Sequence, residues 1–371
     1  MHGLFIRNPD KGVNNLLAPP RAVMTFYGKG TFAFREGGPY SGVMKWIRFG
    51  VALLVCVAGT SRLLAEEVPL EWFPLDAFAG AFGVDSVVET VNVTNSTVVW
   101  ETPGATLRFF DGSRRLEFNG TLVWLNGAIS TNAMAERMIS ETDLESVLAP
   151  LLLATVPSNA PWGTFVVVLD PGHGGVDPGA VVSTNVPYEK DLVLDVAKRV
   201  RRILRQSGIV VRMTRRDDDK TLTLEDRTTI ARKREGSVLV SIHANKAASR
   251  SAQGIETFVL PAAGFPSTAS SEPVAEVYPG NLYDAESLQL GYFIHRELLD
   301  QVQAVDRGVK RARYEVLRNA PCPAALVELG FMSHAAELNK LNTEDYRQRL
   351  AEGIAQGVRI FMLQNTSPGG D

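Results

Sequence analysis

The part of the chain that follows Thr164 alternates between two hydrophobic patterns. Short runs rich in β-branched residues are followed by segments whose apolar residues recur at helical spacing, as Leu192, Val196 and Val200 do. This alternation predicts an α/β fold with a mostly parallel twisted sheet flanked by helices. We expect strands at 164–170, 209–214, 238–243, 255–260 and 324–328, and helices at 191–207, 224–235, 287–303 and 343–363.

The preceding region, 66–155, has short stretches of alternating apolar and polar residues separated by turn residues. Helices are predicted at 74–83, where a glycine ends the segment, and from an N-cap at Thr142 to about Leu148, before Pro150. We expect strands at 87–93, 97–100, 106–110, 115–118 and 121–125. The region therefore reads as a small α+β domain in front of the larger sheet.

The N-terminal part of the chain contains a predicted export signal. A basic stretch from Met44 to Arg48 precedes an uncharged, mostly apolar run from Phe49 to Gly59. That run suits a signal peptide at 44–65 and is too short to cross a bilayer, which needs about 20 residues. Residues 1–43 are a doubtful leader, because they fit badly before an export signal, and we expect the physiological start at Met44. A retained membrane anchor is the alternative.

A linker and a long loop complete the predicted organisation. Residues 156–163 contain proline, serine and glycine and are typical of a linker. The main domain then covers 164–366. Within it, residues 261–286 are rich in proline, serine, alanine and glycine, and we expect a flexible loop that is longer than most connections.

Composition and charge exclude several classes of function. The chain has 371 residues, of which 45% are hydrophobic and 21% charged, as in an ordinary globular protein. The net charge of -3 leaves no basic field for duplex nucleic acid. The two cysteines, Cys56 and Cys322, form no disulfide framework. No histidine partner for Cys322 is suggested by the sequence, so a cysteine nucleophile is disfavoured.

Polar residues capable of metal binding or proton transfer follow several of the predicted strands. His173 lies on a glycine-rich turn after the first strand, His243 closes the third, and Glu328 ends the last. Ligands collect at the carboxyl ends of strands in open α/β sheets. Glu189, sixteen residues after His173 (189 minus 173), is placed to return to the same edge. Two imidazoles and a carboxylate are a known catalytic zinc set, and Glu328 would then carry a proton to the leaving amine.

Each of these residues also has a structural interpretation. His173 could be a loop histidine without a role, and His243 a satisfied core histidine. Glu189 could be a favourable partner of a helix dipole. Glu328, an expensive buried charge if unpaired, could form an ion pair with an arginine such as Arg227 or Arg215.

Other polar residues are assigned supporting roles. Ser241 and Asn245 flank His243 and could orient its ring. Asp177 is predicted to be a turn or supporting residue rather than a ligand, and Arg227 is placed with the supporting residues. We expect His295 to be a surface or packing residue of its helix and His334 to line the rim of the site.

At these residues the chain resembles the amidase type 3 family, the zinc-dependent N-acetylmuramoyl-L-alanine amidases of bacterial cell-wall turnover. The resemblance covers about 164–363, and its many ordered blocks make it specific. The blocks are 169–180, 189–190, 214–215, 224–227, 241–245, 254–257, 307–309, 316–317 and 327–331. The family implies that His173, Glu189 and His243 bind zinc and that Glu328 is the catalytic carboxylate. It also implies cleavage of the amide between the lactyl group of muramic acid and L-alanine.

Two departures from the family pattern concern regulation and the site rim. His334 stands where the family more often has asparagine. Loop 261–286 is longer than in the minimal domain, and some relatives carry an inhibitory helix in this part of the chain, so autoinhibition is a hypothesis. At the Pro74-Leu75 helix and from Gly112-Ser113 to Asn126-Gly127, the region 66–155 resembles the copper amine oxidase-like N-terminal domain. The region has no metal-binding cluster, and we interpret it as a stalk or wall-contact module.

The leading hypothesis is therefore an exported zinc amidase that acts on peptidoglycan in the periplasm or cell envelope. It has no nucleic-acid partner, contacts a membrane only through an uncleaved leader, and has a regulatory protein as a possible partner. One alternative is a zinc peptidase that cuts peptide crosslinks. Another is a non-catalytic wall-binding protein, which predicts a missing ligand or proton carrier, although all four candidates are present.

Overall fold

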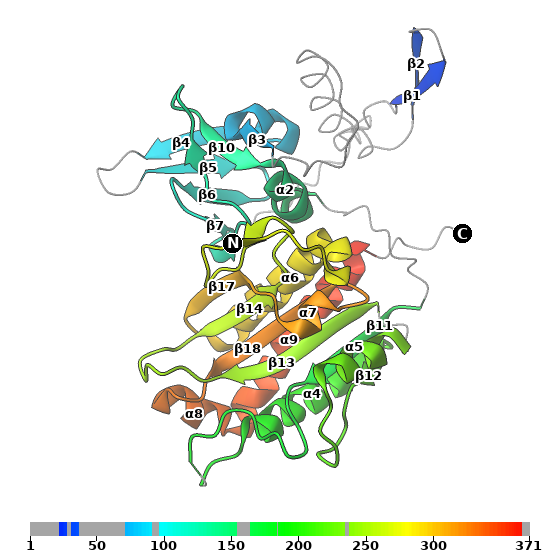
Figure 1. Ribbon diagram of the computed structural model, residues 1–371, viewed down its shortest axis with the longest axis vertical. Coiled ribbons are helices and arrows are strands. Elements are labelled where there is room, and N and C mark those ends of the chain that lie inside the picture. Colours follow the sequence, from blue (N-terminus) through cyan, green and yellow to red (C-terminus); the bar gives the residue numbers. More distant parts are fainter. Residues whose placement is uncertain are drawn as a thin grey trace, which may run out of the picture. The chain divides into compact units, whose positions relative to one another are not determined.

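The computed structural model divides into two compact units, Met1–Val68 and Pro69–Asp371 (Figure 1). It describes residues 71–90, 96–153, 164–183, 185–233 and 237–365, and the backbone of 22–27 and 31–36. In the first unit, strands β1 (Ala22–Tyr27) and β2 (Thr31–Glu36) form an antiparallel hairpin. The predicted signal peptide at 44–65 and most of the predicted linker lie outside the described residues. No described helix combines the length and apolarity needed to span a bilayer.

The second unit is built on an 11-stranded sheet with the order β12-β11-β13-β18-β14-β17-β8-β7-β6-β5-β4. Its first six strands are β12 (Val210–Met213), β11 (Val166–Pro171), β13 (Val238–Asn245), β18 (Ala324–Phe331), β14 (Ile255–Val259) and β17 (Asp306–Arg311). Strands β12, β11, β13 and β18 are parallel, but β14 is antiparallel to β18. The α/β class is confirmed, whereas the sheet is mixed rather than mostly parallel, because strand direction depends on tertiary pairing that the apolar pattern does not encode.

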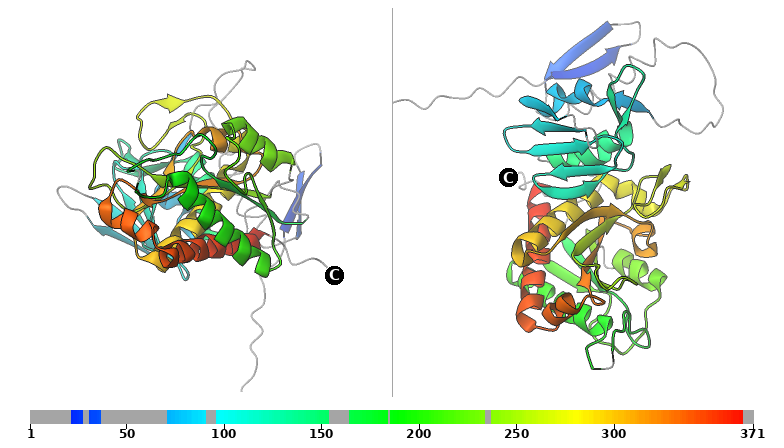
Figure 2. Two further views of the ribbon diagram at one scale, coloured as in Figure 1. Left: turned by 90° about the horizontal axis from the view of Figure 1, so that it is seen from below. Right: turned by 90° about the vertical axis from the view of Figure 1, so that its left-hand side faces the viewer.

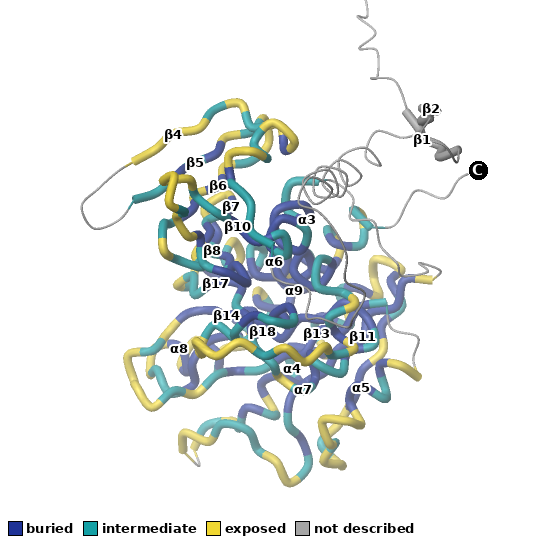
Figure 3. The backbone as a smooth tube through the Cα atoms, turned by 45° about the horizontal axis from the view of Figure 1, so that its top comes forward, coloured by how far each residue is buried: buried dark blue, intermediate teal, exposed yellow. Residues whose placement is uncertain are grey.

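Helices cover both faces of the parallel part of the sheet (Figures 1 and 2). They are α4 (Glu189–Gln206), α5 (Leu224–Lys233), α6 (Asp284–Val302), α7 (Glu315–Arg318), α8 (Ala335–Leu341) and α9 (Glu344–Asn365). Helices α4, α6 and α9 pack together on one face, and α5 and α7 cover the other. The strands between these layers are buried, as Figure 3 shows. The long predicted helices are confirmed to within a few residues at their ends.

The region before residue 154 extends the same sheet. Its elements are β3 (Trp72–Pro74), η1 (Leu75–Phe78), η2 (Gly80–Phe82), β4 (Ser86–Thr90), β5 (Thr97–Glu101), β6 (Thr106–Phe110), β7 (Arg115–Phe118), β8 (Thr121–Trp124), β9 (Ser130–Thr131) and β10 (Arg137–Ser140). Strand β8 pairs with β17 through Val123 and Val309, so five strands of this region continue the central sheet. The division into domains at 66–155 and 164–366 stays a prediction, because residues 69–155 and 164–366 belong to one compact unit, Pro69–Asp371.

The helix at the end of this region differs from the prediction. Its N-cap is Ser140, whose hydroxyl accepts a hydrogen bond from the N–H of Asp143, and not Thr142. The helix continues through α2 (Glu141–Asp143), the wider turn η3 (Leu144–Leu148) and α3 (Ala149–Leu152). Pro150 therefore does not end the helix, which continues from the wider turn η3 into α3.

Loop 261–286 is ordered by hydrogen bonds, so the expectation of a flexible loop is wrong. It contains β15 (Phe265–Pro266), β16 (Pro273–Val274) and η4 (Pro279–Tyr283). Arg313 donates to the carbonyls of Phe265 and Ala262, and Arg114 donates to that of Pro266. The loop follows the carboxyl end of β14, which is antiparallel to β18, so it starts at the sheet edge opposite the end of β18.

Candidate active site

Segments far apart in the chain meet at one edge of the sheet. His173 lies on the loop after β11, and His243 lies in β13. Glu328 lies in β18, where it is the Cα partner of His243. Because β11, β13 and β18 are parallel neighbours, their carboxyl ends share this edge. Glu189 begins α4, and its side chain reaches both histidines.

The side chains of His173, Glu189 and His243 converge. Glu189 Oε1 lies 3.1 Å from His173 Nε2 and 3.1 Å from His243 Nδ1. The two imidazole centroids are 5.0 Å apart, and the rings are inclined at 81°. One possible ligand atom from each residue lies within 4.8 Å of the others. Two imidazole nitrogens and a carboxylate oxygen at these separations are compatible with a divalent metal ion.

Electrostatic interactions keep Glu189 ionised within this cluster. Burial alone would raise the pKa of Glu189, but hydrogen bonds and charge attraction from His173 and His243 hold that pKa well below its usual range. Its carboxylate also accepts hydrogen bonds from the N–H groups of Ala244 (3.0 Å) and Ala180 (2.8 Å). Burial lowers the pKa of His173, but the Glu189 and Asp177 carboxylates raise it above the ordinary value. The cluster thus presents a firmly held negative charge between two imidazoles.

Two glycines allow the backbone to approach the cluster. A Cβ on Gly172 would lie 2.2 Å from Cε1 of His243, which is closer than any real contact. Gly179 has a φ of +67°, and a Cβ there would lie 2.6 Å from both Glu189 Oε2 and His173 Cδ2. Any side chain at these positions would displace a member of the cluster.

Two buried arginines hold the loop that carries His173. The Arg227 guanidinium donates to the carbonyls of Pro171 (2.9 Å) and His173 (2.8 Å) and to Asp170 Oδ1 (2.8 Å). Arg215 donates to the carbonyls of Pro171 (3.0 Å) and Gly172 (2.7 Å). His173 has a φ of +59°, a left-handed conformation that is unfavourable for a residue with a side chain. The hydrogen bonds from the two arginines therefore stabilise the loop in this unfavourable left-handed conformation at His173.

We expect Arg227→Gln to lower the free energy of unfolding by about 3 kcal/mol, because it leaves the buried Asp170 carboxylate without its ionic partner. Chemical denaturation of the full chain measures this change. Arg232→Gln, an exposed position on the same helix, is the matched control and should change the free energy by less than about 0.5 kcal/mol. Equal stability of the two variants would contradict a stabilising role of the Arg227–Asp170 ion pair.

The same pair predicts a pH dependence of stability. Burial alone would raise the pKa of Asp170, but Arg227 and Thr214 hold it below the ordinary value. The folded state thus binds this proton less readily than the unfolded chain, so the contribution is present above the unfolded pKa of about 3.9 and is lost as the pH falls through the folded pKa. Arg227→Gln removes the main charge that lowers the pKa of Asp170. The loss of stability that protonation of Asp170 causes at low pH should therefore be smaller in this variant than in the wild type.

Glu328 lies beside the cluster with one oxygen unpaired. Its Oε2 is buried and has no hydrogen-bond partner within the described parts of the chain. Burial raises the pKa of Glu328 well above its usual value, and the carboxylates of Glu189 and Glu256 add to the rise. Such a group in a site is suited to exchange a proton with a substrate.

The ion-pair interpretation of Glu328 is wrong for both arginines. Arg227 pairs with Asp170, and Arg215 binds backbone carbonyls. Asp170 also accepts hydrogen bonds from Thr214 Oγ1 at 2.6 Å and from Ser241 Oγ at 2.9 Å. Sequence reasoning missed the supporting role of Asp170, although its position at the end of an apolar strand is the same signal that singled out Glu328.

The supporting residues predicted around the histidines behave differently from one another. Asp177 Oδ2 lies 2.7 Å from His173 Nδ1, so it orients the ring and leaves Nε2 toward Glu189. Ser241 donates to Asp170 rather than to His243. The register shifts between His243 and Asn245, and the Asn245 carbonyl accepts a hydrogen bond from the N–H of Met332. Among the described residues, neither Ser241 nor Asn245 forms a hydrogen bond to His243 that would orient its ring.

The contacts of three further residues indicate structural roles. His334 is the N-cap of α8, where its ring accepts a hydrogen bond from the Glu337 N–H. His295 is fully buried between Thr257 and Asp306, which confirms a packing residue. Cys322 is buried, and burial raises the pKa of its thiol to about 12, which disfavours a nucleophile.

Comparison with protein families gives one match to the main domain. Residues 167–359 match the sequence model of the family described as N-acetylmuramoyl-L-alanine amidase. The match contains His173, Glu189, His243 and Glu328, and the region before residue 154 lies outside it.

Individual relatives are each similar to about half of the chain. The sporulation-specific N-acetylmuramoyl-L-alanine amidase of Bacillus subtilis is 34% identical over 207 residues, which cover 55% of this chain and 71% of the relative. The amidase AmiA of Escherichia coli is 35% identical over 220 residues, covering 53% of this chain and 75% of the relative. A solved amidase structure from Clostridium difficile 630 is 34% identical, covers 56% of this chain and 99% of that chain, and has a TM-score of 0.46.

Proposed function

Since this chain belongs to the N-acetylmuramoyl-L-alanine amidase family, we propose that it hydrolyses the amide between N-acetylmuramic acid and L-alanine of peptidoglycan by means of a zinc ion held by His173, Glu189 and His243. The observation that carries the assignment of the site is the convergence of these three side chains next to Glu328 at one edge of the sheet. The peptidoglycan substrate agrees with the amidase relatives.

The residues present fit a zinc ion by their chemistry. Neutral imidazole and carboxylate are ligands that zinc accepts, and a three-residue set leaves a position for water or substrate. Asp177 supports His173 from the far side of the ring, an arrangement common behind zinc-bound histidines. Because Gly172 and Gly179 have no side chain, the backbone can lie close to the three candidate ligands without displacing them.

In the proposed reaction the protein groups bind, orient and move protons. When bound, the zinc supplies a Lewis acid that polarises the scissile carbonyl and makes water more acidic. Glu328 takes the proton of the attacking water and returns it to the leaving nitrogen of L-alanine. The raised pKa of Glu328, caused by burial and by the neighbouring carboxylates of Glu189 and Glu256, suits this carboxyl group to hold and release a proton. Arg227 and Arg215 keep the His173 loop in place throughout, so the ligand geometry does not have to form during the reaction.

Mass spectrometry of digested cell-wall sacculi tests the bond that is cut. We expect the full chain to release peptides with a free L-alanine amine and to leave glycan strands with free lactyl carboxyl groups. Boiled protein is the control. Fragments shortened within the stem peptide or at crosslinks would instead support the zinc peptidase, and undigested sacculi would support the wall-binding alternative.

Export and the accessory region complete the proposal. A wall substrate requires the enzyme to reach the periplasm or cell envelope, and the pattern at 44–65 is the proposed route. The residues before 154 are proposed as a stalk or wall-contact module, and the pairing of β8 with β17 would hold them at a fixed position beside the amidase strands. A regulatory protein stays a prediction without a contact assigned to it. The autoinhibition hypothesis for loop 261–286 is weakened, because the first residues of the loop lie at the opposite edge of the sheet.

A further inference from the structure

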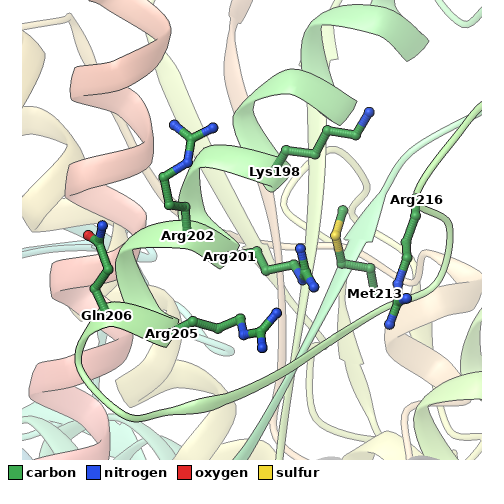
Figure 4. Close-up of a pocket in the computed structure, with 7 residues that line it drawn as sticks. All are labelled: Lys198, Arg201, Arg202, Arg205, Gln206, Met213 and Arg216. Carbon is green, nitrogen blue, oxygen red and sulfur yellow. The ribbon is translucent and has the colours of Figure 1, made fainter.

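A pocket lined by cations lies on α4, well beyond its first residue, Glu189. The pocket has a volume of about 610 Å³ (Figure 4). Its cationic residues, which we call the basic pocket, are Lys198, Arg201, Arg202, Arg205 and Arg216. Figure 4 shows the Arg201 and Arg205 side chains extending from the helix toward the side formed by Met213 and Arg216. No acidic residue lines the pocket.

The cations of the basic pocket are not paired. Within the described residues, none of the five side chains forms an ion pair or a hydrogen bond, and Arg201 Nε is buried without a partner. By contrast, Arg199 on the same helix binds Asp195 at 2.9 Å. Burial lowers the pKa of Arg201, and the charges of Arg205 and Arg216 lower it further. Like charges thus lie close together without an internal anion.

General features of helices do not explain this arrangement. Cations at a helix C-terminus are favourable, but the effect is confined to the last turn and so covers Arg205, not Lys198 or Arg201. Ordinary solvated faces intersperse both signs, whereas positions 198, 201, 202 and 205 have i, i+3, i+4 and i+7 spacing on one stripe and one sign. Such repulsion destabilises the isolated helix, so an external anion is the natural counterpart.

The chemistry of the pocket selects the type of anion. Guanidinium groups bind phosphate and carboxylate through paired N–H donors, and a phosphate group offers more acceptor oxygens per group. The pocket is large enough for more than one such group. A flat membrane surface fits less well, because none of the exposed large apolar side chains in the described residues belongs to α4 or β12. We propose that the basic pocket binds successive phosphate groups of a phosphate-bearing polymer.

This site is separate from the amidase chemistry. With a rise of about 1.5 Å per residue, the cations at 198–205 lie roughly 14–24 Å along α4 from Glu189. Arg216 directly follows Arg215, which binds the loop carbonyls next to His173. The proposal therefore goes beyond the amidase function and assigns the protein a second ligand, which would retain the enzyme near an anionic polymer while its active site works.

The test is a binding titration of the full chain with labelled long-chain polyphosphate at about 0.15 M salt. The variant R201Q/R205Q removes two guanidinium groups and keeps good helix-forming residues. We expect its affinity to fall at least about tenfold. The matched control R232Q/K233Q removes two exposed charges from the end of α5 and should bind within about twofold of the wild type. Circular dichroism and amidase activity on soluble muropeptides should be unchanged in both variants.

Further ligands separate the sources of the anion. Inorganic phosphate should compete only weakly, because it occupies the pocket one group at a time. Equal affinities of R201Q/R205Q and the wild type for polyphosphate would overturn the proposal. Polyglutamate that binds the pocket as well as polyphosphate would overturn the choice of phosphate. Binding to phosphatidylglycerol vesicles that requires Arg201 and Arg205, without binding of polyphosphate, would replace the polymer with a membrane surface.

Discussion

Glu328→Gln should abolish peptidoglycan hydrolysis while leaving the metal bound. General acid–base groups contribute about 10²–10⁴-fold, so we expect kcat to fall by roughly 10³-fold. The amide keeps the size of the carboxyl group but cannot take the proton of the attacking water. Stability should stay the same or rise, because the buried Oε2 has no partner among the described residues and two other carboxylates repel it. Muropeptide release, zinc content and unfolding of the same preparation measure the three quantities.

The matched control for this variant is Glu352→Gln, a surface position on α9. It should retain full activity, which shows that the loss at Glu328 does not come from the change of charge alone. If Glu328→Gln retained more than about a tenth of the wild-type kcat, another group would have to carry the proton. If it lost its zinc, Glu328 would be a ligand instead.

His243→Ala should remove both zinc and activity. The remaining imidazole and carboxylate form an incomplete set, and even changes behind zinc ligands cost about 10–100-fold in affinity. Zinc added to the wild type should raise its thermal midpoint, because under the proposed function the ion binds the three side chains that converge only in the folded state. The variant should lose this shift. Metal content after dialysis and thermal unfolding with and without zinc provide the measurements.

His334→Asn is the control for loss of a histidine. Asparagine preserves an N-cap acceptor for α8, so the fold should be kept. The wild-type zinc content in this variant would show that the loss in His243→Ala is specific to the cluster. Zinc binding by His243→Ala at wild-type affinity would mean that the metal is held elsewhere.

The sequence allowed much of the site to be predicted, because its residues lie at the ends of strands with a strong local pattern. The apolar runs before His173 and His243 fixed where those side chains emerge, and the parallel order of β11, β13 and β18 then brought Glu328 next to His243. Glu189 could not be selected from local pattern alone, because a glutamate at the start of a helix is common without a metal. Its prediction depended on the expectation that the chain returns to the same edge of the sheet.

The rest depended on tertiary contacts that no local pattern carries. Strand β17 could not be predicted from its hydrophobic pattern, because the strand contains several charged residues. Their partners are distant in sequence: Arg311 donates to the carbonyl of Trp124, and Lys310 binds Glu256. Two of the carbonyls bound by Arg215, those of Pro171 and Gly172, are more than forty residues away in sequence. The loop 261–286 appeared flexible by composition, but the arginines that order it lie outside the loop.

Anomalous diffraction from crystals of the full chain grown with zinc tests the proposed metal centre most directly. The account predicts a single strong peak at the zinc edge within bonding distance, about 2.0–2.2 Å, of a nitrogen of His173, a nitrogen of His243 and an oxygen of Glu189, with Glu328 adjacent and not bound. A peak bound by other residues, or zinc-soaked crystals without a peak between these side chains, would contradict it.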